Sequence, residues 1–62
     1  MCEANVYLLE DDGVKTLLLE SVDRIIPQGE NLYLENIFGE RKTIKAQIAE
    51  MALVDHKIIL KP

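Results

Sequence analysis

The chain has 62 residues and a formal net charge of −4, from eleven acidic and seven basic side chains. A chain of this length buries only about 60% of its unfolded surface and usually depends on disulfides, a metal or a partner subunit for stability. Its one cysteine excludes an internal disulfide, and its acidic charge disfavours nucleic acid and anionic membranes as partners. We therefore expect one small domain, residues 1–62, that is stabilised by a metal, by oligomerisation or by both.

No segment has the features of a transport signal or a membrane span. Glu3 and the acidic run from Glu10 to Asp12 interrupt any apolar core of a signal peptide. The apolar runs are far shorter than the roughly 20 residues that cross a bilayer. A thiol without a partner agrees with a reducing compartment. We expect a cytoplasmic protein.

Apolar and polar residues alternate along most of the chain, and turn-forming residues recur between the alternating segments. This pattern predicts an all-β fold, a small barrel of six to seven short antiparallel strands. The expected strands are 3–10, Val14–Glu20, Val22–Ile26, Leu32–Ile37, Arg41–Ile48 and Lys57–Lys61, with a further strand beginning at Met51.

Three local signals define the boundaries between these strands. Asp11-Asp12-Gly13 predicts a hairpin turn in which Gly13 adopts a positive φ. Pro27 has no N–H for a ladder and is expected to end its strand. Residues 46–53 are ambiguous, because Ala, Glu and Met favour helix. We interpret them as a strand end, a short turn or 3₁₀ segment, and a strand start at Met51.

The alternation predicts two apolar faces. One set is assigned to the core: Ala4, Val6, Leu8, Val14, Leu18, Ile26, Leu32, Leu34, Ile44, Leu53, Ile58 and Leu60. A second set is left over: Tyr7, Leu9, Leu17, Leu19, Tyr33 and Ile59. Exposed apolar patches usually mark an interface, so we expect a homodimer that covers the second face.

The strongest chemical signal is Cys2, directly after Met1. The thiolate of Cys2, a backbone nitrogen and the terminal amine of Met1 lie close enough along the chain to close small chelate rings. Such N/S donor sets favour planar Ni(II) or Cu(II), whereas structural zinc prefers four Cys or His ligands. One chain supplies too few ligands, and a two-fold dimer that joins two N-termini would complete the set. The alternative is an incidental thiol in a frayed terminus.

Two further features carry weaker hypotheses. His56, between Asp55 and Lys57, is interpreted as a solvated turn residue, with an accessory metal contact oriented by Asp55 as the alternative. The basic residues Arg41, Lys42 and Lys45 offer a surface for RNA or a protein partner. No nucleophile–base pair and no phosphate-binding glycine motif is present in the sequence, so we do not expect an enzyme.

The whole chain resembles the CooT family of small nickel-binding proteins, which act in maturing nickel-dependent carbon monoxide dehydrogenase. The resemblance rests on the Met1-Cys2 start, the first hairpin closed by Asp12-Gly13 and the segment from Lys42 to Leu60. It implies an SH3-like barrel, a homodimer, and one Ni(II) held between the Cys2 residues of two chains. It also implies a metallochaperone whose partners are the nickel enzyme or its maturation proteins. His56 is not part of the matching motif.

Overall fold

The computed structural model describes residues 3–62, and every regular element in this part of the chain is a β-strand. The predicted all-β fold class is confirmed. The strands are β1 (Ala4–Leu9), β2 (Lys15–Gln28), β3 (Asn31–Asn36), β4 (Arg41–Lys45), β5 (Gln47–Ala52) and β6 (Lys57–Lys61). The described residues contain no helix that is long and apolar enough to cross a membrane.

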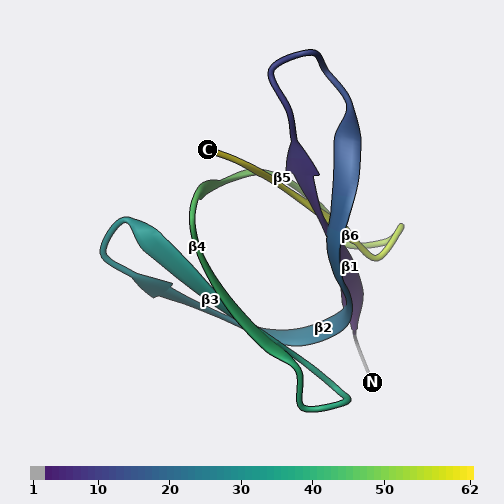
Figure 1. Ribbon diagram of the computed structural model, residues 1–62. Coiled ribbons are helices and arrows are strands. Elements are labelled where there is room, and N and C mark those ends of the chain that lie inside the picture. The colour runs from purple at the N-terminus through teal and green to yellow at the C-terminus, as the bar shows by residue number, and fades with distance from the viewer. Residues whose placement is uncertain (1–2) are drawn as a thin grey trace.

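The six strands form one sheet in the order β4-β3-β2-β1-β6-β5, which curls around the core as Figure 1 shows. The pairs β1–β2, β2–β3, β3–β4 and β5–β6 are antiparallel. β1 and β6 pair parallel, with Val6 opposite Ile58 and Leu8 opposite Leu60. The expectation of antiparallel strands throughout is wrong at this pair. The two ends of the chain run in the same direction, and alternation cannot show that because it is identical in both pairing modes.

The hairpin turn predicted at residues 11–13 joins β1 to β2. Gly13 has a φ of 86°, in the left-handed region that glycine adopts without steric cost. The turn is closed by the N–H of Glu10, which donates to the carbonyl of Val14 at 2.8 Å. The side chain of Asp12 accepts from the N–H of Val14 at 3.0 Å, an arrangement typical of Asx turns.

The second and third expected strands are one continuous strand, β2, which bends at Ser21. Ser21 has a φ of 56°. Its N–H donates to the side chain of Asn5 at 3.1 Å, and its carbonyl accepts from the N–H of Ile37 at 3.0 Å. Pro27 does not end the strand, because β2 continues to Gln28, opposite Asn31. The bonds to Asn5 and Ile37 thus lie at the junction of two segments that were expected to be separate strands.

The ambiguous segment is also resolved differently from the expectation. Residues 47–52 form β5 without interruption, and no turn or 3₁₀ segment precedes Met51. Ala46 is buried between β4 and β5, where the chain passes from one end of the sheet to the other. Packing of its methyl group in the core has outweighed helix propensity, which is a weak preference.

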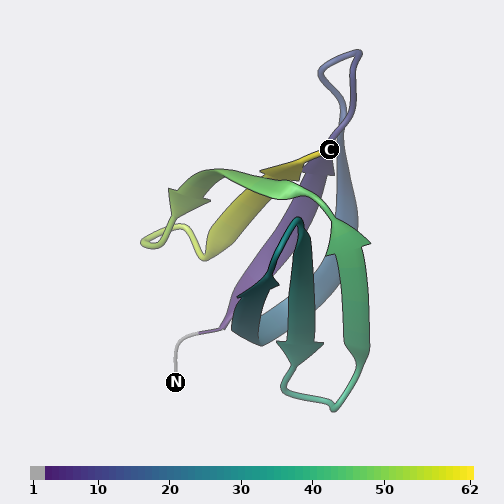
Figure 2. The same ribbon diagram turned by 90° about the vertical axis from the view of Figure 1, so that its left-hand side faces the viewer.

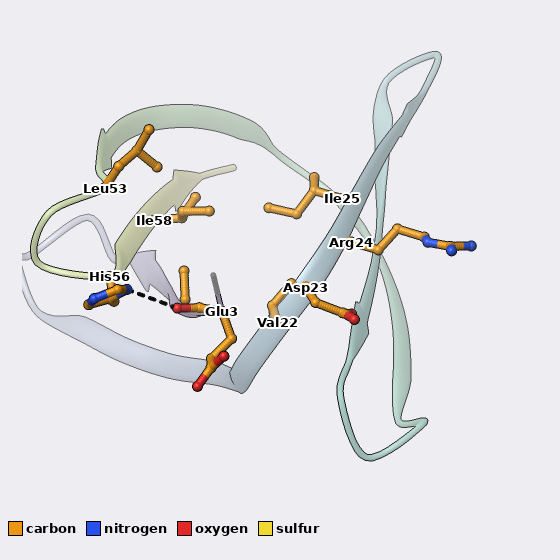
Figure 3. A pocket seen from close by; sticks show the side chains of 9 residues that line it. Glu3, Val22, Asp23, Arg24, Ile25, Leu53, His56 and Ile58 are labelled. Carbon is orange, nitrogen blue, oxygen red and sulfur yellow. Dashed lines mark hydrogen bonds between the residues drawn. The ribbon is translucent and has the colours of Figure 1, made fainter. Parts of the chain in front are cut away.

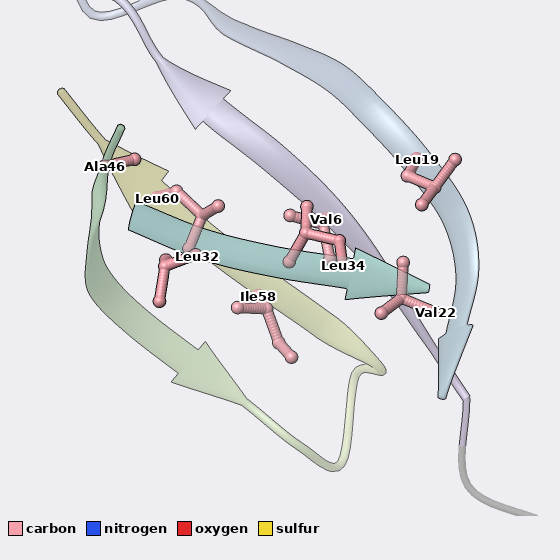
Figure 4. Packing of buried hydrophobic residues seen from close by; sticks show 8 residues of the cluster. All are labelled: Val6, Leu19, Val22, Leu32, Leu34, Ala46, Ile58 and Leu60. Atoms are coloured by element: carbon pink, nitrogen blue, oxygen red, sulfur yellow. The ribbon is translucent and has the colours of Figure 1, made fainter. Parts of the chain in front are cut away.

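The core lies inside the curled sheet, as Figure 4 shows. Leu34, Leu60 and Val6 are its most deeply buried side chains. The core cluster consists of Val6, Leu19, Val22, Leu32, Leu34, Ala46, Ile58 and Leu60.

The predicted core set is wrong at three positions, since Val14, Ile26 and Leu53 are exposed. In the opposite direction, Leu19 and Ile59 of the second set are buried. Met51 in β5 is 52% exposed as well. Register shifts between β1 and β2 on both sides of Val6 explain why Leu19 is buried, because each shift changes which residues of β2 face inward.

Candidate functional site

The predicted ligands Met1 and Cys2 lie outside the described residues. The structure describes the chain from Glu3 onward, and the surroundings of Glu3 are therefore the nearest described part of the candidate site. Glu3 leads directly into β1, the strand that pairs with both β2 and β6.

The residue that contacts Glu3 is His56. Its ring nitrogen Nδ1 lies 3.2 Å from the backbone carbonyl oxygen of Glu3, although 53 positions separate the two residues (Figure 3). Two residues further along, the N–H of Asn5 donates to the carbonyl of His56 at 2.8 Å. His56 is thus exposed in a turn, as predicted, but it is bonded to the segment that follows Cys2. Among the described residues the ring nitrogen contacts Glu3, and not Asp55.

The contact with Glu3 defines the chemistry of the imidazole. A carbonyl oxygen only accepts hydrogen bonds, so a hydrogen bond at this contact requires the tautomer that carries the proton on Nδ1. In the neutral ring Nε2 then keeps its lone pair, the arrangement by which proteins commonly orient a metal-binding histidine. His56 also has a φ of 56°, an uncommon conformation for a residue with a side chain. The backbone is held in this conformation by the bonds on both sides of the turn.

A mostly apolar pocket of about 240 Å³ opens beside this contact. Figure 3 shows that its walls come from β2 on one side and from β6 and the β5–β6 turn on the other. The pocket is lined by Glu3, Ala4, Val22, Asp23, Arg24, Ile25, Leu53, His56 and Ile58. The contact between the Glu3 carbonyl and the His56 ring therefore lies beside a pocket that is lined mainly by aliphatic side chains.

The basic residues of the alternative hypothesis lie together on β4, at one end of the sheet. Two of them have interactions within the chain. Lys45 pairs with Glu30 at 3.5 Å, and the ammonium of Lys42 donates to the carbonyl of Leu18 at 3.3 Å. Arg41 faces Glu35 across the β3–β4 ladder. Glu30 and Glu35 beside these basic residues make the β4 surface less suitable for binding phosphate backbones.

Tyr33 on β3, the strand beside β4, has a raised pKa. Partial burial, followed by the hydrogen bond from the Tyr33 hydroxyl to Glu35 at 3.0 Å, raises the pKa of Tyr33. A phenol is protonated at neutral pH even without this rise in pKa, so Tyr33 adds no charge to the β4 strip.

Comparison with known proteins identifies the family. The sequence profile of CooT, described as CO dehydrogenase accessory protein CooT, matches residues 1–61. The chain belongs to the CooT family. It is therefore an accessory protein of carbon monoxide dehydrogenase and not an enzyme itself, as the sequence predicted.

Two relatives are consistent with this assignment. A crystal structure assigned to CooT from Carboxydothermus hydrogenoformans is 52% identical and superposes with a TM-score of 0.90, covering 97% of this chain and 95% of that one. An uncharacterized protein of Archaeoglobus fulgidus is 40% identical over 43 residues, which are 69% of this chain and 96% of the archaeal one. The CooT family thus accounts for nearly the full length and for the fold.

The sequence analysis did not find the contact of Glu3 with His56, which is made by the backbone carbonyl of Glu3 and not by its side chain. It also placed Leu53 in the core, whereas Leu53 is exposed at the rim of the pocket. No signal in the sequence pairs residue 3 with residue 56, because their contact depends on the parallel pairing of β1 and β6.

Proposed function

We propose that the chain is a nickel-binding metallochaperone, which delivers Ni(II) for maturation of nickel-dependent carbon monoxide dehydrogenase. The metal is held by Cys2 at the interface of a homodimer in the cytoplasm, and its partners are the nickel enzyme or its maturation proteins. The CooT family match supports the accessory role. The metal, the dimer and the delivery step are the parts that experiment must establish.

The observation that carries the proposal concerns the donors available in the fold. Residues 3–62 contain no group of three or more His, Cys, Asp or Glu side chains that could hold a metal ion. This supports a metal site that uses Cys2, with the nitrogen donors of Met1 and Cys2 as co-ligands. Thiolate with amine and deprotonated amide is a donor set that suits planar Ni(II).

The dimer follows from the number of ligands. The thiolate and the nearby nitrogens of one chain do not fill all the ligand positions of a planar metal ion. One chain alone would therefore need an external ligand. Two chains related by a two-fold axis would supply equivalent donors to one ion. The site then needs no further side chain of the described fold, and dissociation of the dimer would open it for transfer.

His56 is proposed as an accessory contact and not as a permanent ligand. Its Nε2 is free to accept when Nδ1 is bonded to Glu3, and its position beside the N-terminal segment is suitable for a transient contact. Such a contact would change how fast nickel leaves, and it would leave the stoichiometry unchanged.

Nickel titration of the wild type and of Cys2→Ser, followed by thiolate-to-metal absorption in the ultraviolet, tests the proposal. We expect one Ni(II) per two chains for the wild type and loss of that site in Cys2→Ser. Because the ligand is a thiolate, binding should release protons and weaken as the pH falls below neutrality. His56→Ala is the matched control and should keep the stoichiometry.

A second arm alters only the nitrogen donors. An added N-terminal tag keeps the thiol but removes the terminal amine from its neighbourhood, and we expect it to abolish the site. Unchanged stoichiometry and affinity in Cys2→Ser would contradict the proposal and direct attention to His56.

A further inference from the structure

The outer face of the sheet carries part of the second apolar set. Tyr7 on β1 lies opposite Leu17 on β2 and opposite Ile59 on β6, so the three residues form one row across three strands. Their chain neighbours Val6 and Ile58 belong to the core cluster, and successive side chains of a strand point to opposite faces. The row therefore lies on the face of the sheet that is turned away from the core.

Two lysines, Lys15 and Lys57, lie beside this row. Together with Tyr7 and Ile59 they line a pocket of about 130 Å³. Both lysines are exposed, and neither has an ion pair among residues 3–62. The pocket thus combines two apolar side chains with two cationic groups that are available to an anion from outside the chain.

The charge of this pocket is opposite to that of the chain as a whole. The chain has a net charge of −4, yet none of the described residues that line the pocket is acidic. A third lysine, Lys61, lies two residues beyond Ile59 on β6 and so on the same face. Across the β5–β6 ladder Ile59 lies opposite Glu50, one carboxylate against three ammonium groups. The surface around the pocket is therefore positive on an acidic protein.

We propose that this pocket receives an acidic side chain of a partner protein. The carboxylate pairs with the ammonium groups of Lys15 and Lys57, in hydrogen bonds of the charge-assisted, stronger kind. The methylene groups of the same side chain pack on Tyr7 and Ile59. The inference goes beyond the proposed function, because it assigns a surface for the partner and depends neither on nickel nor on the homodimer.

The size of the pocket favours a single side chain over a larger ligand. An apolar cavity of about 150 Å³ holds one benzene molecule, so a pocket of about 130 Å³ suits a group of the size of a glutamate side chain. A nucleic acid is disfavoured as the occupant, because its repeated phosphates would meet the net charge of −4.

The surroundings of the pocket favour a protein over a free acid. Apolar surface continues past the pocket to Leu17, which is 50% exposed, and to Leu9, which lies opposite Lys15. A partner with its own apolar side chains would cover these residues while its acidic group fills the pocket. The accessory role of the CooT family also implies contact with another protein.

The test uses a blocked peptide, acetyl-Leu-Glu-Leu-amide, and its counterpart with glutamine in place of glutamate. Both are titrated into the isotopically labelled full chain, and NMR signals of Tyr7, Ile59 and the two lysines are followed. We expect the glutamate peptide to bind about tenfold more tightly, because hydrogen bonds between charged groups are the stronger ones. The difference should disappear at about 1 M salt, which screens exposed charges. Equal binding of the two peptides, or none up to about 10 mM, would overturn the proposal.

Matched variants locate the binding. Lys15→Ala with Lys57→Ala removes the two cationic groups of the pocket, whereas Lys42→Ala with Lys45→Ala removes the same charge on β4. We expect the first variant to lose the preference for the glutamate peptide and the second to keep it, with circular dichroism as the check on folding. The same loss in both variants would reduce the effect to net charge and would overturn the pocket.

Two further measurements separate this proposal from other occupants and from the metal site. Binding of an oligouridylate at lower concentration than the glutamate peptide would assign the face to nucleic acid, and a dimer lost only in Lys15→Ala with Lys57→Ala would assign it to a second copy. Either result would overturn the partner surface. We expect this variant to keep the nickel stoichiometry of the wild type, and Cys2→Ser to bind the glutamate peptide as the wild type does. Failure of nickel binding alone would therefore leave this proposal standing.

Discussion

The β3–β4 and β5–β6 turns, whose positions in the ribbon Figure 2 shows, both carry exposed apolar residues, and they are held by different means. In the β3–β4 turn, the buried side chain of Asn36 accepts from the N–H groups of Phe38 and Glu40 and donates to the Glu40 carboxylate. In the β5–β6 turn, His56 is bonded to Glu3 and Asn5 at the start of β1. The first turn is satisfied mainly within itself, whereas the second is attached to the N-terminal segment.

The difference shows which exposed apolar residues carry a functional argument. Phe38, 66% exposed, lies on a turn whose polar groups have local partners and which has no recorded contact with Glu3. Val54 lies on the turn that is bonded to the residue after Cys2. Similar exposure therefore has a different meaning in the two places, and variants in each turn can test the distinction.

The largest effect on stability is expected at Asn36. Asn36→Ala removes three hydrogen bonds from a side chain that is 2% exposed. We expect a loss of about 2–3 kcal/mol in the free energy of unfolding, because three hydrogen bonds are lost, one of them to a carboxylate. Urea unfolding at one fixed protein concentration measures it. A loss below about 1 kcal/mol would show that water replaces the side chain and that the turn is less self-contained than the structure indicates.

The next effect is expected at His56, where ring and backbone can be separated. His56→Ala loses the Glu3 contact and keeps a side chain at a φ of 56°, whereas His56→Gly loses the contact but relieves the backbone. We expect His56→Gly to be more stable than His56→Ala by about 1 kcal/mol. Equal stabilities would indicate that the turn changes conformation once the imidazole is removed.

The smallest effect on stability is expected for a pair of exposed residues, Phe38→Ser and Leu53→Ser. Each should change the free energy of unfolding of the single chain by less than about 0.5 kcal/mol, since both side chains are largely in solvent. Their effects on the proposed dimer should differ, because Leu53 lines the same pocket as Glu3, the residue after Cys2, and Phe38 does not. Leu53→Ser should weaken the dimer and Phe38→Ser should leave it intact. Sedimentation decides, and a weaker dimer in Phe38→Ser alone would reverse the comparison of the two turns.

Much of the fold could be predicted where the signal is local. The period of two predicted strands, and Gly13 predicted the first turn, which its φ of 86° confirms. The errors arose where distant segments decide. Leu19 is buried because register shifts around Val6 rotate β2 relative to β1, and Ser21 bends because Asn5 and Ile37 bond to it.

The candidate site divides in the same way. The sequence alone determined the all-β class, the resemblance to the CooT family and the position of the single thiol, because period, motif and composition are properties of neighbouring residues. Only the tertiary structure placed His56 against the Glu3 carbonyl and set Leu53 at an apolar pocket. Both depend on the parallel pairing of β1 with β6, which joins segments about fifty residues apart. Side-chain alternation records which face of a strand is apolar, but it contains no information on the strand beside it.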